Sequence, residues 1–241
     1  MPVLASMTLA LATAAATVAT SRGDQPMIVY APPESARSAA GKPLVLVLSG
    51  EGGWRAFDVQ LASWLSADGY WVGGVDCLKY FWKPQDDRAA LAADVALYAA
   101  ALRRAAGAAA GTRVVLAGFS FGADLAPWIA GVGAHGPRIA GLVLIGPDEQ
   151  GSLEARVVEI LGFAPKAHTF DTAKALADVR PIPVLFVHGG SDDDSAAPAL
   201  AAGYAGPKAL AVVAGAKHHF AGHEDELKRA VLDGLKQILA R

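Results

Sequence analysis

Short runs of apolar residues alternate along the chain with longer segments in which apolar residues recur every three or four positions. The runs are continuous, as expected of strands that are buried on both faces of a parallel sheet. The longer segments have the spacing of amphipathic helices. Strands are predicted at 43–48, 70–75, 113–117, 139–145, 183–187 and 209–213, and helices at 57–65, 86–102, 123–130 and 224–239. This alternation predicts a single α/β domain with a doubly wound, mostly parallel sheet.

The beginning of the chain departs from this pattern. Residues 3–19 are apolar with threonines and carry no charge, which resembles the hydrophobic core of a secretory signal. The small residues at 17–19 suit a cleavage site, although only the terminal amine supplies positive charge before the apolar run. We therefore expect residues 1–21 to be a signal peptide that directs export. An uncleaved membrane anchor is the alternative.

The next segment, residues 22–42, is rich in Pro, Ser and Ala. We expect it to be a linker that contains an edge strand at 27–30. The α/β domain is then expected to span residues 43–241.

Composition and charge narrow the classes of function. The formal net charge is −2 at pH 7, and no basic stripe runs along the chain. Nucleic acid is therefore not an expected partner. Cys77 is the single cysteine, which excludes an intrachain disulfide and a cysteine-based zinc site. Neither a metal nor a cofactor is expected at the functional site.

The pentapeptide at 118–122, Gly-Phe-Ser-Phe-Gly, stands between an apolar run and an apolar-rich helical segment. A G-x-S-x-G sequence between a strand and a helix is the nucleophile elbow of α/β-hydrolases. The turn presents Ser120 as a nucleophile at a helix N-terminus. There the backbone amide of Phe121 can stabilise a developing oxyanion.

Three other loops fall where an α/β-hydrolase needs them. The glycine-rich loop at 50–53 should supply the second oxyanion amide, which we assign to Glu51. Asp192 follows the strand at 183–187 and is the expected acid, with Asp193 as the reserve. His218 follows the last strand and is the expected general base. The order of serine, acid and histidine along the chain is that of the α/β-hydrolase triad.

Two further features adjoin these loops. His219 cannot face the serine together with its neighbour, since adjacent side chains diverge, so it is expected to be structural or to face the substrate. Residues 149–172 are less regular than the rest and contain a possible short helix at 153–161. Because insertions at this point often cover the site, this segment is the candidate lid.

Four motifs together resemble the VirJ/AcvB family of bacterial virulence proteins, and the likeness spans about residues 42–241. They are Ser-Gly-Glu-Gly-Gly-Trp at 49–54, the aromatic run at 75–82, the elbow with Asp124 at 118–124, and His-His-Phe at 218–220. The resemblance implies the α/β-hydrolase fold and export to the periplasm. It also implies hydrolysis of aminoacylated phosphatidylglycerol, chiefly the lysyl ester, or a role in type IV secretion.

The chain departs from the family pattern at several positions. The family usually has Asp at position 51, Ser at 77 and Glu at 192, where this chain has Glu, Cys and Asp. Residues 131–170 match the family poorly. The reaction type is therefore better supported than the substrate.

An aminoacyl ester carries a cationic amine close to the scissile carbonyl. Glu51, Asp76 and Asp124 could surround the nucleophile and recognise that amine, although Asp124 is equally explained as an acid at a helix N-terminus. Tyr80 and Trp82 could contact acyl chains, with a hydrophobic cap as the alternative. We assign these residues and His219 as candidate substrate-binding residues.

The leading hypothesis is thus a periplasmic serine esterase that acts on an aminoacyl phospholipid and contacts a membrane surface. A small-ester or dienelactone-type hydrolase is the alternative within enzymes. A secretion accessory that keeps the hydrolase fold and binds secretion-system proteins is the alternative outside them.

Overall fold

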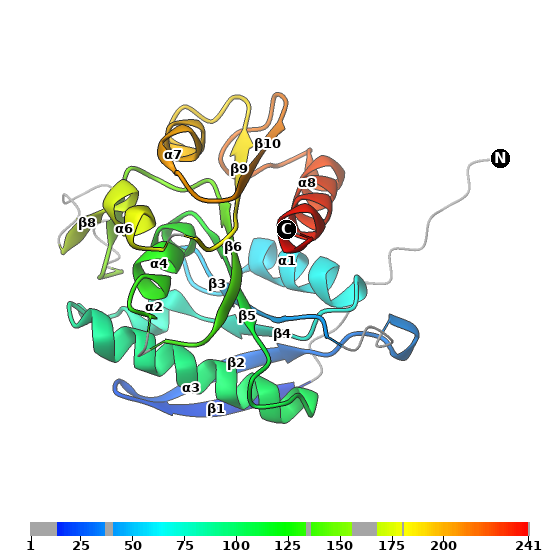
Figure 1. Ribbon diagram of the computed structural model, residues 1–241, viewed down its shortest axis with the longest axis vertical. Helices are drawn as coiled ribbons and strands as arrows, with labels where there is room; N and C mark the ends of the chain where they lie inside the picture. The colour runs from blue at the N-terminus through cyan, green and yellow to red at the C-terminus, as the bar shows by residue number, and fades with distance from the viewer. Residues whose placement is uncertain (1–13, 37–40, 134–135, 156–167, 180, 241) are drawn as a thin grey trace.

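The computed structural model describes residues 14–36, 41–133, 136–155, 168–179 and 181–240. Eight strands form one sheet in the order β1-β2-β4-β3-β5-β6-β9-β10, drawn in Figure 1. In that order the strands are β1 (Ala14–Thr20), β2 (Gly23–Tyr30), β4 (Val72–Val75), β3 (Leu44–Leu48), β5 (Val114–Phe119), β6 (Ile139–Ile145), β9 (Val184–Gly189) and β10 (Lys208–Val213).

The six strands from β4 to β10 run parallel to one another, whereas β1 and β2 are antiparallel to their neighbours. β3 and β5 at the centre are buried along their whole length. Helices therefore cover both faces, as the continuous apolar runs predicted. The predicted mostly parallel sheet is confirmed.

Helices lie on both faces of the sheet (Figure 1). On one face pack α1 (Ala56–Ala67) and α8 (Glu224–Leu239); on the other pack α3 (Arg88–Ala106), α4 (Phe121–Ala130), α6 (Thr172–Asp178) and α7 (Ala197–Gly203). The short helix α2 (Cys77–Tyr80) follows β4, and a 3-10 turn, η1 (Glu34–Ala36), follows β2. Each face has its own apolar core, so the doubly wound single domain is confirmed.

The long helix α3 shows why the sequence folds locally as predicted. The carboxylate of Asp87 accepts a hydrogen bond from the backbone amide of Ala90 at 3.0 Å and caps the first turn. Leu91, Val95 and Leu102 are buried against the sheet. The helix ends at Gly107, whose φ of 61° favours glycine.

The N-terminal segment is more tightly integrated than its sequence suggested. Gly23–Tyr30 is a strand of the sheet rather than part of a linker. It is not an edge strand either, because β1 pairs with it on the side away from β4. The edge is formed by Ala14–Thr20, which overlaps the expected signal peptide. Export and cleavage remain predictions.

The hairpin of β1 and β2 is fastened to the rest of the fold through Asp94 on α3, which is buried. The backbone amide and the hydroxyl of Ser21 donate hydrogen bonds to the two carboxylate oxygens of Asp94, at 2.8 and 2.5 Å. The hydroxyl of Tyr80 donates to the same carboxylate at 2.6 Å. This network joins the hairpin to α2 and α3.

Part of the candidate lid is a small separate sheet. β7 (Gln150–Ser152) pairs antiparallel with β8 (Thr169–Asp171) beside α4. His168 Nδ1 lies 2.9 Å from Asp86 Oδ1, which ties this sheet to the loop before α3. Most of the helix expected at 153–161 lies outside the described residues.

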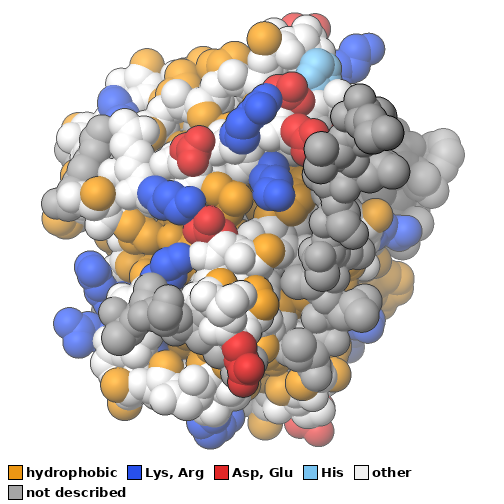
Figure 2. Space-filling model, turned by 90° about the vertical axis from the view of Figure 1, so that its right-hand side faces the viewer, with side chains coloured by type: hydrophobic (Ala, Val, Ile, Leu, Met, Phe, Trp, Pro, Cys, Tyr) orange, Lys and Arg blue, Asp and Glu red, His pale blue; other side chains and the backbone are white. Residues whose placement is uncertain are grey.

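The surface carries both signs of charge. Figure 2, turned to face the right-hand side of Figure 1, shows basic and acidic side chains interspersed with hydrophobic ones. This mixture agrees with the small net charge of −2. None of the helices in the described residues is long and apolar enough to cross a membrane.

Candidate active site

The four loops singled out in the sequence all follow the carboxyl ends of parallel strands. They follow β3, β5, β9 and β10, whose carboxyl ends lie along the same edge of the sheet. In open α/β sheets, ligands bind at this edge. The fold therefore gathers the predicted site residues at one end of the molecule.

Ser120 lies between β5 and α4 in a strained backbone conformation, with a φ of 51° and a ψ of −119°. The turn is held by a hydrogen bond of 2.9 Å from the amide of Ser120 to the carbonyl of Ile145. A Cβ at Gly122 would lie 2.2 Å from the carbonyl oxygen of Leu48, and one at Gly118 would lie 2.2 Å from Gly122. Only glycine permits these approaches, which explains why the elbow has glycine on both sides of the serine.

Asp192 is paired with His218. Its Oδ2 lies 2.9 Å from Nδ1 of His218, and the residue is buried. Asp193 is exposed, so the choice between the two carboxylates falls on Asp192. A carboxylate at Nδ1 orients the imidazole and leaves its Nε2 for a proton from the nucleophile.

Ser120 and His218 line one pocket with a volume of about 540 Å³. Among the described residues, no direct hydrogen bond joins the side chains of Ser120 and His218. Catalytic hydrogen bonds are often long before substrate binds, so the shared pocket is the more informative observation.

Two backbone amides are available as oxyanion donors. The amide of Phe121 belongs to the first residue of α4, and the amide of Glu51 follows β3 directly. Neither amide donates a hydrogen bond to another group within the described residues. The close approach of Gly122 to the carbonyl oxygens of Leu48 and Ser49 brings the two segments together. The assignment of these two amides to the oxyanion hole stays a prediction.

The pocket beside Ser120 is lined by acidic residues. They are Asp124, Asp148, Glu149, Asp193 and Asp194. Its described lining includes no Lys or Arg, and His218 is the only basic side chain. Glu149, Asp193 and Asp194 form no ion pair with the other residues that the structure describes. In the described part of the chain, no group of three or more His, Cys, Asp or Glu side chains could hold a metal ion. The acidic side chains give the pocket wall a negative charge.

Two predicted substrate-binding residues have structural contacts instead. Asp124 is buried, and its Oδ1 accepts a hydrogen bond of 2.8 Å from the amide of Asp148. It lines the pocket, and its carboxylate holds the loop after β6 through this hydrogen bond. Tyr80 is buried against Phe81 and bonded to Asp94, so the structure does not bring it to the pocket.

The other predicted substrate-binding residues are absent from the lining of the acidic pocket. Neither Glu51 nor Asp76 lines the acidic pocket; Asp76 caps α2 and lies 3.6 Å from the Lys79 ammonium. Trp82 is 60% exposed. His219 lines the neighbouring hollow and packs near the Phe119 ring, at 5.8 Å between ring centres.

Sequence reasoning missed the acids that follow β6. Asp148 and Glu149 come just after the Gly-Pro turn at the carboxyl end of that strand, a position that could have identified them. It also missed Asp58, which lies beneath the glycine-rich loop and accepts a hydrogen bond of 2.9 Å from the amide of Arg55. Burial raises the pKa of Asp58 to about 6, and the charge of Asp76 adds to the shift.

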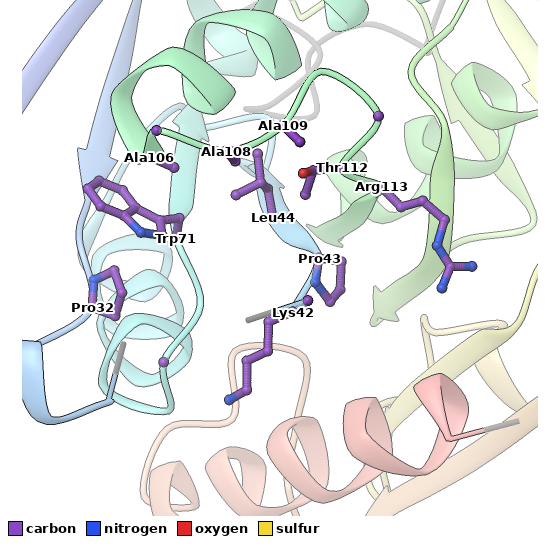
Figure 3. A pocket seen from close by; sticks show the side chains of 14 residues that line it. Pro32, Lys42, Pro43, Leu44, Trp71, Ala106, Ala108, Ala109, Thr112 and Arg113 are labelled. Carbon is purple, nitrogen blue, oxygen red and sulfur yellow. The ribbon is translucent and has the colours of Figure 1, made fainter. Parts of the chain in front are cut away.

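A second hollow, with a volume of about 700 Å³, lies at the opposite end of the sheet from Ser120. Figure 3 shows Lys42, Leu44, Trp71 and Arg113 among its lining residues. Its described lining contains no serine, cysteine, histidine or carboxylate. The described lining of this hollow holds no combination of serine, histidine and acid, so the acidic pocket is the candidate active site.

The strand order, the elbow at Ser120 and the pairing of His218 with Asp192 define an α/β-hydrolase, the class in which a serine, a histidine and an acid act together. The chain belongs to the bacterial virulence protein (VirJ) family, because the family's sequence profile matches residues 42–239. This confirms the family suggested by the motifs. A comparison with curated proteins found no match.

Solved structures share the fold at low sequence identity. Est1E from Butyrivibrio proteoclasticus has a TM-score of 0.66 and 16% identity, covering 94% of this chain and 99% of that one. Dienelactone hydrolase from Anabaena variabilis has a TM-score of 0.68 and 17% identity, with 94% and 97% covered. XC6422 from Xanthomonas campestris, an α/β serine hydrolase without a lid, has a TM-score of 0.60 and 19% identity, with 93% and 94% covered. These similarities support the fold assignment.

Proposed function

We propose that this protein is a serine esterase in which Ser120 is the nucleophile, His218 the general base and Asp192 the acid that orients the histidine. The observation that carries the proposal is the 2.9 Å contact between His218 and Asp192 in the pocket wall that also holds Ser120. The contact occupies Nδ1 of His218, so Nε2 is the ring nitrogen left to accept the serine proton.

The chemistry follows from these roles. The Ser120 hydroxyl attacks the ester carbonyl while its proton passes to His218, and the amides of Glu51 and Phe121 stabilise the oxyanion. The imidazolium returns the proton to the leaving alcohol as the ester C–O bond breaks. Water then attacks the acyl-enzyme, again losing a proton to His218. Release of the acid restores the serine hydroxyl.

We further propose that the acyl group carries an ammonium, as in the lysyl ester of aminoacylated phosphatidylglycerol. Glu149, Asp193 and Asp194 support this choice, because they line the pocket beside Ser120 and form no ion pair within the described part of the chain. Carboxylates in a cleft attract a cation and disfavour an anionic acyl group. Glu51 and Asp76 lie outside this pocket and are assigned no contact with the ammonium.

A phospholipid substrate implies contact with a membrane surface. Trp82 is 60% exposed and lies between the cationic side chains of Lys79 and Lys83 in the sequence. The preceding residue, Phe81, packs edge-on against Phe121 with 5.4 Å between ring centres, so the segment that carries Trp82 passes close to the elbow. Aromatic rings flanked by cations suit the interface of an anionic bilayer. Export to the periplasm, which would place the protein beside such a membrane, is part of this proposal.

Hydrolysis of lysyl-phosphatidylglycerol by the purified protein and by Ser120→Ala tests the proposal. Release of lysine by the wild type and its loss in the variant are expected, with unchanged circular dichroism spectra. Equal lysine release by a folded Ser120→Ala protein would refute the nucleophile. Labelling with a fluorophosphonate probe is expected for the wild type and not for Ser120→Ala.

A small-ester hydrolase is the second candidate, and the similarity in fold to a dienelactone hydrolase favours it. Turnover of small neutral esters without lysine release would select that function. A protein that neither labels nor hydrolyses either substrate would instead fit a type IV secretion accessory, which would be tested by binding to secretion-system proteins.

A further inference from the structure

Ser49 follows β3 and is fully buried, with no exposed surface. Its hydroxyl bridges two backbone groups from different loops. Oγ donates a hydrogen bond to the carbonyl of Gly50 and accepts one from the amide of Cys77, each at 3.0 Å. The hydroxyl has a single proton, so the direction of both bonds is fixed.

The carbonyl of Gly50 accepts a second hydrogen bond. The amide of Gly53 donates to it at 3.1 Å and closes the glycine-rich turn. In a planar trans peptide, the carbonyl and the following N–H point in opposite directions. The two hydrogen bonds to the Gly50 carbonyl therefore also set the direction of the Glu51 N–H.

The Glu51 amide itself has no hydrogen-bond partner among the described residues. No hydrogen bond from a described residue fixes the N–H group directly, so its orientation depends on the Gly50 carbonyl of the same peptide. The elbow lies close by, because a Cβ at Gly122 would be 2.7 Å from the carbonyl oxygen of Ser49. A rotation of the Gly50–Glu51 peptide would therefore turn the amide away from Ser120.

We propose that Ser49 is a positioning residue, which fixes the Gly50–Glu51 peptide so that the Glu51 amide faces the oxyanion formed at Ser120. The inference rests on the proposed function, since an oxyanion arises only if Ser120 attacks a carbonyl. Through Cys77, Ser49 also fastens this peptide to the start of α2. A preorganised donor stabilises the transition state without binding the ground state more tightly.

Ser49→Ala removes both hydrogen bonds of the hydroxyl. Loss of an oxyanion donor costs about 10²- to 10³-fold in kcat, so loss of its support is expected to lower kcat by roughly 10- to 100-fold. KM is expected to stay within about twofold, because the lost interaction acts on the transition state. A boronic acid that mimics the tetrahedral intermediate is expected to bind more weakly by about the same factor as the fall in kcat.

Ser66→Ala is the matched control. Ser66, on α1, is also fully buried. Its hydroxyl donates a hydrogen bond of 2.8 Å to the backbone carbonyl of Ala31. It makes no contact with the glycine-rich loop in this structure. Its loss is expected to reduce thermal stability while kcat stays at the wild-type value.

Ser49→Cys is the second variant, for the case that Ser49→Ala does not fold. It keeps the size of the side chain but weakens both hydrogen bonds, and its kcat is expected between those of Ala and wild type. A wild-type kcat in a folded Ser49→Ala or Ser49→Cys protein would overturn the inference.

The same assay separates this inference from the proposed function. Wild-type turnover that is lost in Ser120→Ala supports the proposed function, and an unchanged kcat in the Ser49 variants then refutes the positioning role alone. If wild type and Ser120→Ala are equally inactive towards a soluble p-nitrophenyl ester and lysyl-phosphatidylglycerol, both are overturned.

Discussion

The carboxylate of Asp124, on the first turn of α4, accepts a hydrogen bond of 2.8 Å from the backbone amide of Asp148. Asp124 is buried, whereas Asp148 belongs to the loop after β6 that carries two acids to the pocket. Asp124 therefore holds the loop that forms the acidic wall. Its effect on a cationic substrate is indirect.

This contact predicts a difference between two variants of Asp124. Asp124→Asn keeps an oxygen that can accept the hydrogen bond, so turnover of charged and neutral esters should fall by a similar, small factor. Asp124→Ala removes the acceptor, and the loss of a hydrogen bond to a charged group should cost about 1.5–3 kcal/mol of unfolding free energy. Urea titrations and kcat/KM on both esters measure these effects. A loss confined to the cationic ester in Asp124→Asn would show that this carboxylate meets the substrate directly.

The charge of the pocket wall should decide substrate preference. Glu149→Gln and Asp193→Asn each remove one unpaired carboxylate, and exposed ion pairs are worth about 0.2–1 kcal/mol. Each variant should lower kcat/KM for a lysyl ester by roughly 1.4- to 5-fold and leave a neutral ester unchanged. The preference should weaken with added salt. Asp225→Asn, an exposed change on α8, is the control, and equal losses on both esters would contradict a role in charge recognition.

The pairing of Asp192 with His218 predicts a large kinetic effect with little loss of fold. Asp192→Asn should lower kcat by up to about 10⁴-fold, because the imidazole loses the partner that orients it. Asp193→Asn should leave kcat on a neutral ester unchanged, since its side chain is exposed and the His218 contact is made by Asp192. Steady-state kinetics on a p-nitrophenyl ester compares the two. A larger loss in Asp193→Asn would reverse the assignment.

The buried carboxyl of Asp58 should make stability depend on pH. Its pKa is raised from 3.8 to about 6, so the folded state favours the protonated form. The stability that this preference contributes is present below pH 3.8 and is lost as the pH rises through about 6. The shift of about two units corresponds to about 3 kcal/mol, at 1.36 kcal/mol per unit.

Asp58→Asn should remove this dependence. The variant should gain about 2 kcal/mol over wild type on going from pH 4 to pH 7, because the unfolded Asp is already partly ionised at pH 4, while an Asn side chain can still accept the Arg55 amide. Urea unfolding at half-unit steps between pH 4 and pH 7 measures the difference. A difference that does not change with pH would show that Asp58 ionises normally in the folded state.

Local signals explain what the sequence could predict. The recurrence of apolar residues, among them Leu91, Val95 and Leu102, predicted the helix at 86–102, which the structure places at Arg88–Ala106 as α3. Ser120, Asp192 and His218 could be found because each follows a strand in a fixed order, and the sheet brings strand ends together whatever the intervening sequence is. Only the structure distinguishes Asp192 from the adjacent Asp193, because the turn places the carboxylate of Asp192 beside His218.

Contacts between residues far apart in the sequence determine the features that the sequence did not predict. Tyr80 was expected to face the substrate, but the Asp94 carboxylate, contributed by α3, holds its hydroxyl inside the fold. The acidic wall depends on a loop after β6 that Asp124 fixes from another element. Residues 14–20 were expected to belong to a signal peptide or an anchor, and their pairing with β2 is a contact that the apolar run alone did not reveal.

If the chain is exported as proposed, the edge strand β1 couples the order of folding and export. Ala14–Thr20 pairs with β2 along its whole length, and these residues overlap the apolar run expected to engage the export machinery. Residues held by a translocation channel cannot pair with β2, so export would have to precede closure of the sheet. Cleavage after Ala19 would leave Ser21 attached to Asp94 but would expose the hydrogen-bonding edge of β2. Removal of the leader would then create an edge to which a strand from another protein could add.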